Sequence, residues 1–369
     1  MKKIFINGLY IFNIGLPSGI FLFLLISGKQ SFAIQINLLF SSVLFFTSSL
    51  SSYHRQNVLS ENNINYCKNI IINRVKFFPF ILISTYILAL YFLRINNLFL
   101  IFSVICLLFV IWLVEILLSI DEILEKKNFL LKYVFNFING VCLLFFIFFV
   151  DEFYLSYYLA YFAMSYFYIN IYDKRNIKKF NKPYNIKKNY LGYVSSLVVN
   201  FILLINKFFI NHYFDPHTVS LVFLSFMITS FFNTIVANSF GPYLFSHFIK
   251  IKQLVLSAFL YLLFIASVLF YLIFFKNNLL ILNIIIISGI SGLILFVSFV
   301  IRQRLLSSRD LRLKVAISDI ILSIISFFIL FFIISFFMSN IFYFILVTTF
   351  LTFLFYFGLF ILSNKILKN

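Results

Sequence analysis

The chain has few charged residues, and acids are the scarcest of them. Only 11% of its 369 residues are charged, with 11 Asp and Glu against 29 Lys and Arg, whereas soluble domains carry about 25% charged residues. Hydrophobic residues make up 63% of the chain. This composition excludes a soluble globular protein and predicts an integral membrane protein.

Cysteine, metal-ligand patterns and catalytic motifs are also lacking. The three cysteines, Cys67, Cys106 and Cys142, show no CxxC spacing, which argues against a disulfide or zinc framework. The four histidines are scattered without metal-ligand spacing. The chain has no HxxxxD acyltransfer motif, no DxD site in a loop, no phosphate-binding glycine loop and no nucleophile elbow. We therefore expect no metal, no cofactor and no enzymatic activity.

Long apolar runs fill the chain instead. Each is near the ~20 residues that a helix needs to cross a hydrocarbon core, and none alternates as the strands of a membrane barrel do. The sequence predicts about twelve membrane-spanning helices, at residues 4–27, 31–52, 74–93, 97–119, 128–150, 152–173, 190–212, 216–240, 254–275, 279–301, 315–338 and 340–363.

The basic residues fix the predicted orientation, because cytoplasmic loops are enriched in Lys and Arg. With the N-terminus in the cytoplasm, all of the 29 basic residues fall on the cytoplasmic side except Lys29, Arg94, Lys207 and Lys276. The most basic stretch divides six spans from six, and predicts an N-terminal bundle at 1–173, a cytoplasmic linker at 174–189 and a C-terminal bundle at 190–369. Both termini are then cytoplasmic. The formal charge of +18 lies in these short loops beside lipid headgroups, so no nucleic-acid partner is expected.

Polar residues recur at helical spacing inside several spans. Residues four and seven apart share one helix face, and such stripes line either a polar lumen or a helix–helix contact. The stripes are Ser196, Asn200 and Lys207 in span 7, Ser225, Thr229 and Asn233 in span 8, and Ser41, Ser48 and Ser52 in span 2. For span 2 the helix–helix contact is the favoured interpretation.

Three ionisable residues inside spans each have two interpretations. Lys207 is either a cation held over a cavity for an anionic headgroup such as pyrophosphate, or an interfacial lysine that snorkels to the membrane surface. Asp319 and Glu115 are either proton or cation sites, or members of local ion pairs with Arg312, Lys314 or another loop cation.

Several segments resemble one known family, the O-antigen-type polysaccharide flippases of the multidrug, oligosaccharidyl-lipid and polysaccharide exporter superfamily. The turn Gly28-Lys29-Gln30-Ser31-Phe32-Ala33 resembles the family's G-x-x-x-aromatic-small turn, and His54-Arg55 follows where the family carries a basic residue. Asn206-Lys207, Gly241-Pro242 and the basic turn from Arg302 to Lys314 are similar to later family features. The acid that the family pairs with its basic residue is Asn206 here.

The resemblance implies a MATE-like all-α fold, with two six-helix bundles forming a V. It also implies a bacterial inner-membrane flippase that moves undecaprenyl-pyrophosphate-linked oligosaccharide to the outer leaflet for O-antigen or capsule synthesis, driven by a gradient of H⁺ or Na⁺. Its partners would be the lipid-linked oligosaccharide, membrane lipids and other polysaccharide-assembly proteins.

On this hypothesis the candidate site residues fall into three groups. The cations Lys207, Arg55, Arg74 and Lys76 attract the headgroup, the amides Asn200, Asn233, Asn136 and Asn139 contact sugar hydroxyls, and Asp319 and Glu115 are candidates for ion coupling. Two alternatives remain. A drug/cation antiporter of the same fold is expected to place acids deep in its bundles, and a polysaccharide polymerase is expected to carry a large outer loop.

Overall fold

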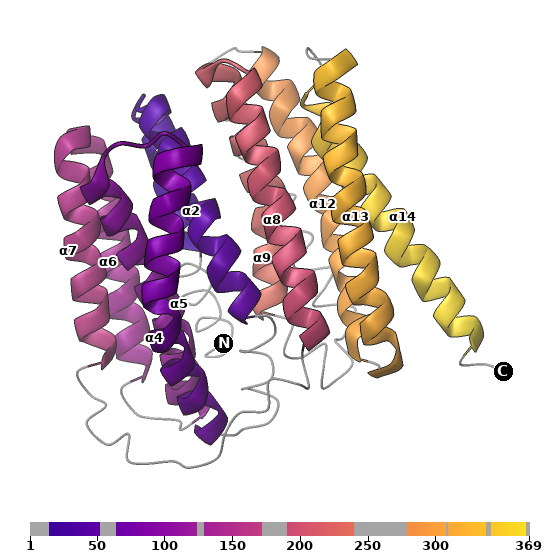
Figure 1. Ribbon diagram of the computed structural model, residues 1–369, viewed down its shortest axis with the longest axis horizontal. Coiled ribbons are helices and arrows are strands. Elements are labelled where there is room, and N and C mark those ends of the chain that lie inside the picture. Colours follow the sequence, from indigo (N-terminus) through magenta and orange to yellow (C-terminus); the bar gives the residue numbers. More distant parts are fainter. Residues whose placement is uncertain are drawn as a thin grey trace. The chain divides into compact units, whose positions relative to one another are not determined.

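The computed structural model describes residues 15–51, 64–123, 129–171, 190–239, 279–307, 309–336 and 341–366. Regular structure within these ranges is entirely helical (Figure 1). Eight of the described helices are long and apolar enough to cross a membrane. The prediction of an all-α membrane protein is therefore confirmed for the described part of the chain.

The chain divides into two compact units, residues 1–208 and 209–369. Unit 1 contains a first helix at Gly15–Ile26 and then α2 (Gln30–Ser51), α4 (Ile64–Ile87), η1 (Leu88–Phe92), α5 (Leu98–Ile123), α6 (Phe129–Phe149) and α7 (Glu152–Ile171). Helix α8 (Tyr190–Tyr213) runs across the division. Unit 2 continues with α9 (Pro216–Ser239), α12 (Leu279–Ser307), α13 (Arg309–Phe336) and α14 (Tyr343–Ile366).

Each predicted span except 254–275 coincides with a described helix, and span 4–27 is described from residue 15 onward. Span 254–275 and the linker 174–189 lie outside the described residues, so the domain boundary placed at that linker stays a prediction. Helix α4 begins at Ile64, well before the expected start at residue 74. The start of the apolar run does not mark the start of α4, because a helix can continue into the headgroup region, where its polar side chains are solvated.

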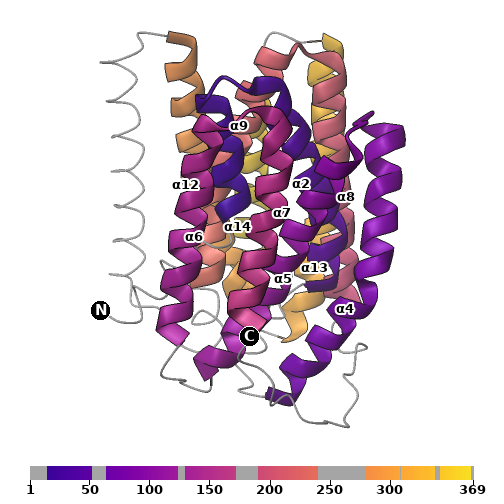
Figure 2. The ribbon, with the colours of Figure 1, turned by 90° about the vertical axis from the view of Figure 1, so that its left-hand side faces the viewer.

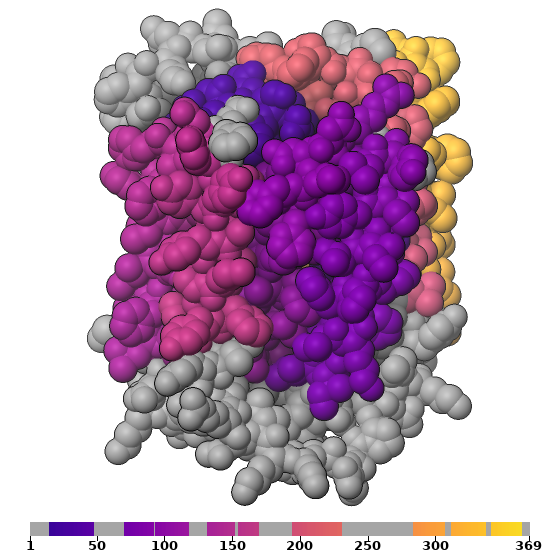
Figure 3. Space-filling view, turned by 60° about the vertical axis from the view of Figure 1, so that its left-hand side comes forward, coloured from indigo at the N-terminus to yellow at the C-terminus, as the bar shows by residue number. Residues whose placement is uncertain are grey.

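Helix α5 is the centre of unit 1. It is apolar on all sides, as expected of a buried helix, and buried residues recur along it, including Leu100, Val104, Leu108 and Leu113. Helices α2, α4, α6 and α7 all contact it. Figure 2 shows α6 and α7 running side by side, and the space-filling view shows this pair packed against α4 and α5 (Figure 3).

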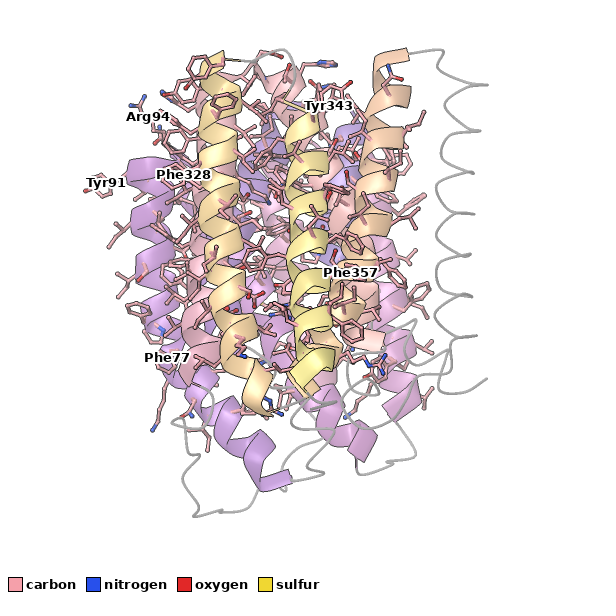
Figure 4. The ribbon with its side chains drawn as sticks, turned by 90° about the vertical axis from the view of Figure 1, so that its right-hand side faces the viewer. Phe77, Tyr91, Arg94, Phe328, Tyr343 and Phe357 are labelled. Atoms are coloured by element: carbon pink, nitrogen blue, oxygen red, sulfur yellow. The ribbon has the colours of Figure 1, made fainter. Side chains whose placement is uncertain are left out.

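Helix α4 ends in an irregular segment. The α-helical pattern gives way to a π-helical turn, η1, in which the N–H of Leu93 donates to the carbonyl of Leu88 at 3.1 Å. Arg94 then adopts a positive φ of 53°, which ends the helix and turns the chain toward α5. Tyr91 and Arg94 are exposed and point away from the helices (Figure 4).

In unit 2, α12 contacts α9, α13 and α14. The outer faces of α13 and α14 carry exposed aromatic side chains, of which Phe328 and Phe357 are labelled in Figure 4. An exposed apolar surface of this extent is typical of a protein that contacts lipid. These faces identify the side of the two helices that meets the hydrocarbon.

Helix starts follow local capping chemistry. The carboxylate of Asp215 accepts hydrogen bonds from the backbone N–H of Thr218 at 3.0 Å and from its hydroxyl at 2.7 Å, and Pro216 occupies the first position of α9. The Thr218 backbone and then its hydroxyl hold the pKa of Asp215 below its ordinary value. Asn97 caps α5 in the same way, by accepting from the N–H of Leu100 at 3.0 Å.

The turn between the first helix and α2 is a Schellman motif. Gly28 has a φ of +80°, its N–H donates to Leu25 O at 3.1 Å, and the N–H of Lys29 donates to Leu24 O at 3.0 Å. The Lys29 ammonium group then donates to the carbonyls of Ile147, at 2.9 Å, and Val150. A cation at the end of α6 also offsets the negative end of that helix's dipole. One turn thus fixes where α2 starts and ties it to α6.

We expect Gly28→Ala to destabilise the protein by about 1–2 kcal/mol, because a Cβ is strained in the left-handed conformation. Gly28→Asn should cost less, since asparagine adopts this conformation more readily. Thermal unfolding of the two variants in detergent measures the difference. Equal melting temperatures for the alanine variant and the wild type would contradict the role of this glycine.

Candidate functional site

Lys207 of α8 contacts two side chains of α2. Its ammonium group donates to the amide oxygen of Asn37 and to the hydroxyl of Ser41, both at 2.7 Å. Asn37 and Ser41 are one helical turn apart, so they lie on the same face of α2. Lys207 is half-buried and lies about 9 Å from the end of α8, at ~1.5 Å per residue. The lysine that the sequence singled out is therefore held by a neighbouring helix.

A second contact between α2 and α8 fixes their relative direction. The rings of Phe45 and Phe201 lie 5.6 Å apart. Phe45 follows Ser41 along α2, whereas Phe201 precedes Lys207 along α8, so the two helices are antiparallel neighbours. The pair combines an aromatic contact with a polar one about two turns away along α8.

Asn200 extends the polar face of α8 that carries Lys207, since residues seven apart share a face. Its amide nitrogen donates to the carbonyl of Ser196 at 2.6 Å and approaches the Ser196 hydroxyl at 3.5 Å. These contacts lie within α8. The predicted stripe of Ser196, Asn200 and Lys207 is thus present on one helix, and its lysine end touches α2.

The amides expected on α6 lie within unit 1. Asn139 donates to the hydroxyl of Ser165 on α7 at 2.7 Å, and Asn136 is fully buried. Hydrogen bonds of this kind join neighbouring helices in a membrane. The structure therefore places Asn139 in a helix–helix contact, and the sugar-binding role of both residues stays a prediction.

Arg74 and Glu115, which the sequence assigned to different roles, meet between α4 and α5. Their side chains lie 3.4 Å apart, and the Arg74 guanidinium also donates to the backbone carbonyl of Trp112 and stacks over the Trp112 ring, 4.4 Å from its centroid. Arg74 is only 2% exposed. The stacking is a cation–π contact. Lys76, two residues later, is exposed.

Asp319 of α13 forms the local ion pair that was its alternative interpretation, with Arg302 of α12 in place of Arg312 or Lys314. Arg302 donates through Nε at 3.0 Å and through Nη2 at 2.6 Å, one bond to each carboxylate oxygen. The hydroxyl of Tyr356 on α14 also donates to Asp319. Because Asp319 and Tyr356 are buried, this cluster joins three helices of unit 2 through one carboxylate. Any role in ion coupling stays a prediction.

Two predicted residues fall outside the description. Arg55 lies outside the described residues, and so does the side chain of Asn233 in α9. Thr229, from the same predicted stripe, donates to the carbonyl of Ser288 at 3.3 Å and so links α9 to α12. Within the described ranges, no group of His, Cys, Asp and Glu is arranged to hold a metal ion.

Asn37 contacts Lys207, although the sequence did not single it out. It lies four residues before Ser41, so it extends the hydroxyl stripe of span 2 by one turn. That spacing was a usable signal. The serines define the predicted stripe, and Asn37 occupies the next position along it.

We expect Asp319→Leu alone to destabilise unit 2 strongly, because it leaves the Arg302 charge without this carboxylate; losing one partner of a buried pair costs about 3–5 kcal/mol. The double variant Asp319→Leu/Arg302→Leu should recover much of that loss. Thermal unfolding of the two single variants and the double variant gives the coupling between the sites. Additive effects would show that the two side chains do not stabilise each other.

Comparison with known proteins places the fold. The chain is similar to a solved structure described as an outward-facing conformation of a multidrug resistance MATE family transporter of the MOP superfamily, with a TM-score of 0.61, 12% sequence identity and 96% of each chain covered. No protein-family model matches the chain, and no curated protein matches it. At this identity the likeness shows the fold alone, and the chain is a multi-pass membrane protein with a MATE-like transporter fold.

Proposed function

We propose that the protein is a flippase that moves undecaprenyl-pyrophosphate-linked oligosaccharide repeat units across the bacterial inner membrane for surface polysaccharide synthesis. The transporter fold supports movement of a substrate across the membrane. The motifs that resemble O-antigen-type flippases support a lipid-linked sugar as that substrate. In this proposal both termini are cytoplasmic, and a gradient of H⁺ or Na⁺ drives transport.

The observation that carries the proposal is the setting of Lys207. Its contacts with Asn37 and Ser41 are made to neutral oxygens, which orient the ammonium group toward α2. A cation inside a span is costly unless it is functional or reaches the interface. A pyrophosphate headgroup is an anion that would recover this cost, because charge-assisted hydrogen bonds are the strong ones.

A drug/cation antiporter is the second candidate, and the printed name of the structural neighbour suits it. An exporter of cationic drugs needs carboxylates available to its substrate. The two acids in span interiors, Glu115 and Asp319, lie 3.4 Å and 2.6 Å from the guanidinium groups of Arg74 and Arg302. These ion pairs favour an anionic substrate over a cationic one.

A polymerase is the third candidate, and loop length argues against it. In the proposed orientation, the described outer connections are residues 27–29, 93–97, 150–151 and 214–215. None of these has room for the large basic outer loop expected of a polysaccharide polymerase. The short turns fit a protein whose chemistry takes place among the helices.

The other predicted residues take secondary roles in this proposal. Arg55, Lys76 and Arg74 would attract the headgroup by charge, although Arg74 already contacts Glu115. Asn200, Asn233, Asn136 and Asn139 would contact the sugar, and Asp319 and Glu115 remain candidates for ion coupling. The protein would work with membrane lipids and other polysaccharide-assembly proteins.

Lys207→Ala is expected to abolish surface polysaccharide while the protein stays at normal abundance in the membrane, because the headgroup loses its cation. Lys207→Arg should retain part of the activity, since it keeps the charge. Staining of surface glycan in a deletion strain complemented with each variant provides the measurement.

Lys314→Ala is the matched control, because the Lys314 side chain is exposed on α13 and has no role in the proposal. Normal surface glycan in the Lys207→Ala strain would remove Lys207 from the mechanism. In the deletion strain, single repeat units linked to lipid should accumulate on the cytoplasmic side, whereas loss of a polymerase would leave them on the outer side.

The proposed orientation predicts that Lys182 and Arg309 lie on the same, cytoplasmic side. Cysteines introduced singly at these positions should both resist an impermeant maleimide in intact cells and react after the membrane is opened. A cysteine at Asp215 should react in intact cells. Labelling of residues 182 and 309 from opposite sides would contradict the orientation.

A further inference from the structure

We infer that the exposed side of α7 is an interaction surface for a second copy of this chain. Residues spaced three and four apart share one side of a helix. Five residues with this spacing form the tyrosine face of α7, and each is more than half exposed: Tyr154, Tyr157, Tyr161, Met164 and Tyr168. Figure 3 shows α6 and α7, in magenta, at the surface of unit 1. The inference is independent of the transported substrate and goes beyond the proposed function.

The neighbouring helix α6 has the composition expected of a side that contacts lipid. Its exposed large residues are aliphatic side chains and phenylalanines, namely Leu131, Phe135, Ile138, Val141, Phe145, Phe146, Phe148 and Phe149. Helix α7 has 20 residues, which is long enough to cross the hydrocarbon core, yet it is not among the eight described helices that are also apolar enough. The two exposed sides therefore differ in chemistry, although α6 and α7 pack against each other.

Tyr161 shows most clearly that the tyrosine face is unsuited to lipid. It lies about 14 Å from each end of α7, at ~1.5 Å per residue, and its side chain is 72% exposed. Within the described part of the chain, its hydroxyl makes no hydrogen bond. Tyrosine is common at the membrane surface, where its hydroxyl reaches water, but a hydroxyl at mid-membrane finds no partner in lipid and is costly there. Tyr161 therefore requires a polar partner at this depth.

The tyrosine face is separate from the polar contact around Lys207. Helix α7 packs against α5 and α6, whereas α2, which contacts Lys207, packs against α4 and α5. The tyrosine face is the side of α7 that these neighbours leave uncovered. It also carries no cation for a pyrophosphate group, so its chemistry suits a neutral partner.

The chemistry of the tyrosine face is complementary to itself. A phenol hydroxyl both donates and accepts a hydrogen bond, so the hydroxyls of two such faces can satisfy each other, and aromatic rings pair favourably in offset or edge-to-face arrangements. From Phe153 to Ile171, α7 contains no charged residue. Two copies can therefore approach through this face without local charge repulsion, although the chain carries a net charge of +18.

Membrane orientation determines which residues meet. Two copies in one membrane point the same way, so their α7 helices run parallel and are related by a two-fold axis along the membrane normal. In such an isologous contact, a residue near the axis meets its own copy. Because Tyr161 lies at the middle of the tyrosine face, it is the residue that we place closest to the axis.

The test is disulfide cross-linking in membranes of cells that make the full-length protein, with the native cysteines Cys67, Cys106 and Cys142 replaced by alanine. Tyr161→Cys should form a covalent dimer on mild oxidation, because the two introduced thiols meet at the axis. We expect at least about fivefold more dimer than for Phe328→Cys, since a disulfide forms only between residues whose Cα atoms come within about 7 Å.

Phe328→Cys is the matched control, because Phe328 is 62% exposed on the lipid-facing side of α13 and lies about 12 Å from the end of its helix. Equal cross-linking of Tyr161→Cys and Phe328→Cys overturns the inference. A covalent product of Tyr161→Cys with a different protein also overturns it, since another chain then occupies the face. If Tyr161→Cys does not accumulate in the membrane, Tyr168→Cys tests the same face.

Counting the bleaching steps of a fluorescent fusion in lipid bilayers measures association of the protein with its native cysteines. The wild type should show two steps, and Tyr161→Phe should associate about threefold more weakly, because hydrogen bonds between membrane helices are modest in strength. A wild type that bleaches in one step overturns the inference, as does unchanged association of Tyr161→Phe. None of these outcomes bears on the proposed transport activity, which the surface-glycan measurements test separately.

Discussion

The cost of placing charge in hydrocarbon governs the arrangement of the described helices. A charge inside a membrane span needs a partner from the protein, because the lipid offers none. Among the described residues inside spans, Arg74 joins α4 to α5, Arg302 joins α12 to α13, and Lys207 joins α8 to α2. Each contact fixes how two neighbouring helices are rotated about their axes and how far one is shifted along the other. Apolar packing alone specifies both weakly.

The three contacts differ in the charge of the groups that meet the cation. Each of the two arginines contacts a carboxylate, so the opposite charges largely cancel. These two clusters chiefly hold neighbouring helices together. The lysine meets an amide oxygen and a hydroxyl oxygen, and neither of these two groups carries a charge. The same cost thus produces structural pairs in two places and a candidate binding feature in a third.

The positions of the helices could be predicted from the sequence because a membrane span is a local property: about 20 apolar residues suffice, whatever the neighbours are. The partners of the ionisable residues could not. For Asp319 the sequence left open a proton or cation site or an ion pair with Arg312, Lys314 or another loop cation. The structure shows a pair with Arg302 on the preceding helix. Tyr356 of α14 also donates a hydrogen bond to Asp319. The sequence did not indicate this contact, because Tyr356 lies in a hydrophobic run that is distant from Asp319 along the chain. The position of Asn37 on the polar face of span 2 can be read from the sequence. Its contact with Lys207 cannot, because the two residues are far apart in the chain.

The π-helical turn η1 has a consequence for how α4 can change in length. Such a turn holds one residue more than the α-helical turn it replaces. It lies at the end of the helix, just before Arg94, whose φ is positive. Removing one residue from η1 would convert the turn to a regular α-helical one while Arg74, well before η1 in the same helix, kept its place opposite Trp112 and Glu115. The end of α4 is thus a point where an insertion or deletion can be absorbed locally, in the turn before α5, without moving the contacts of Arg74.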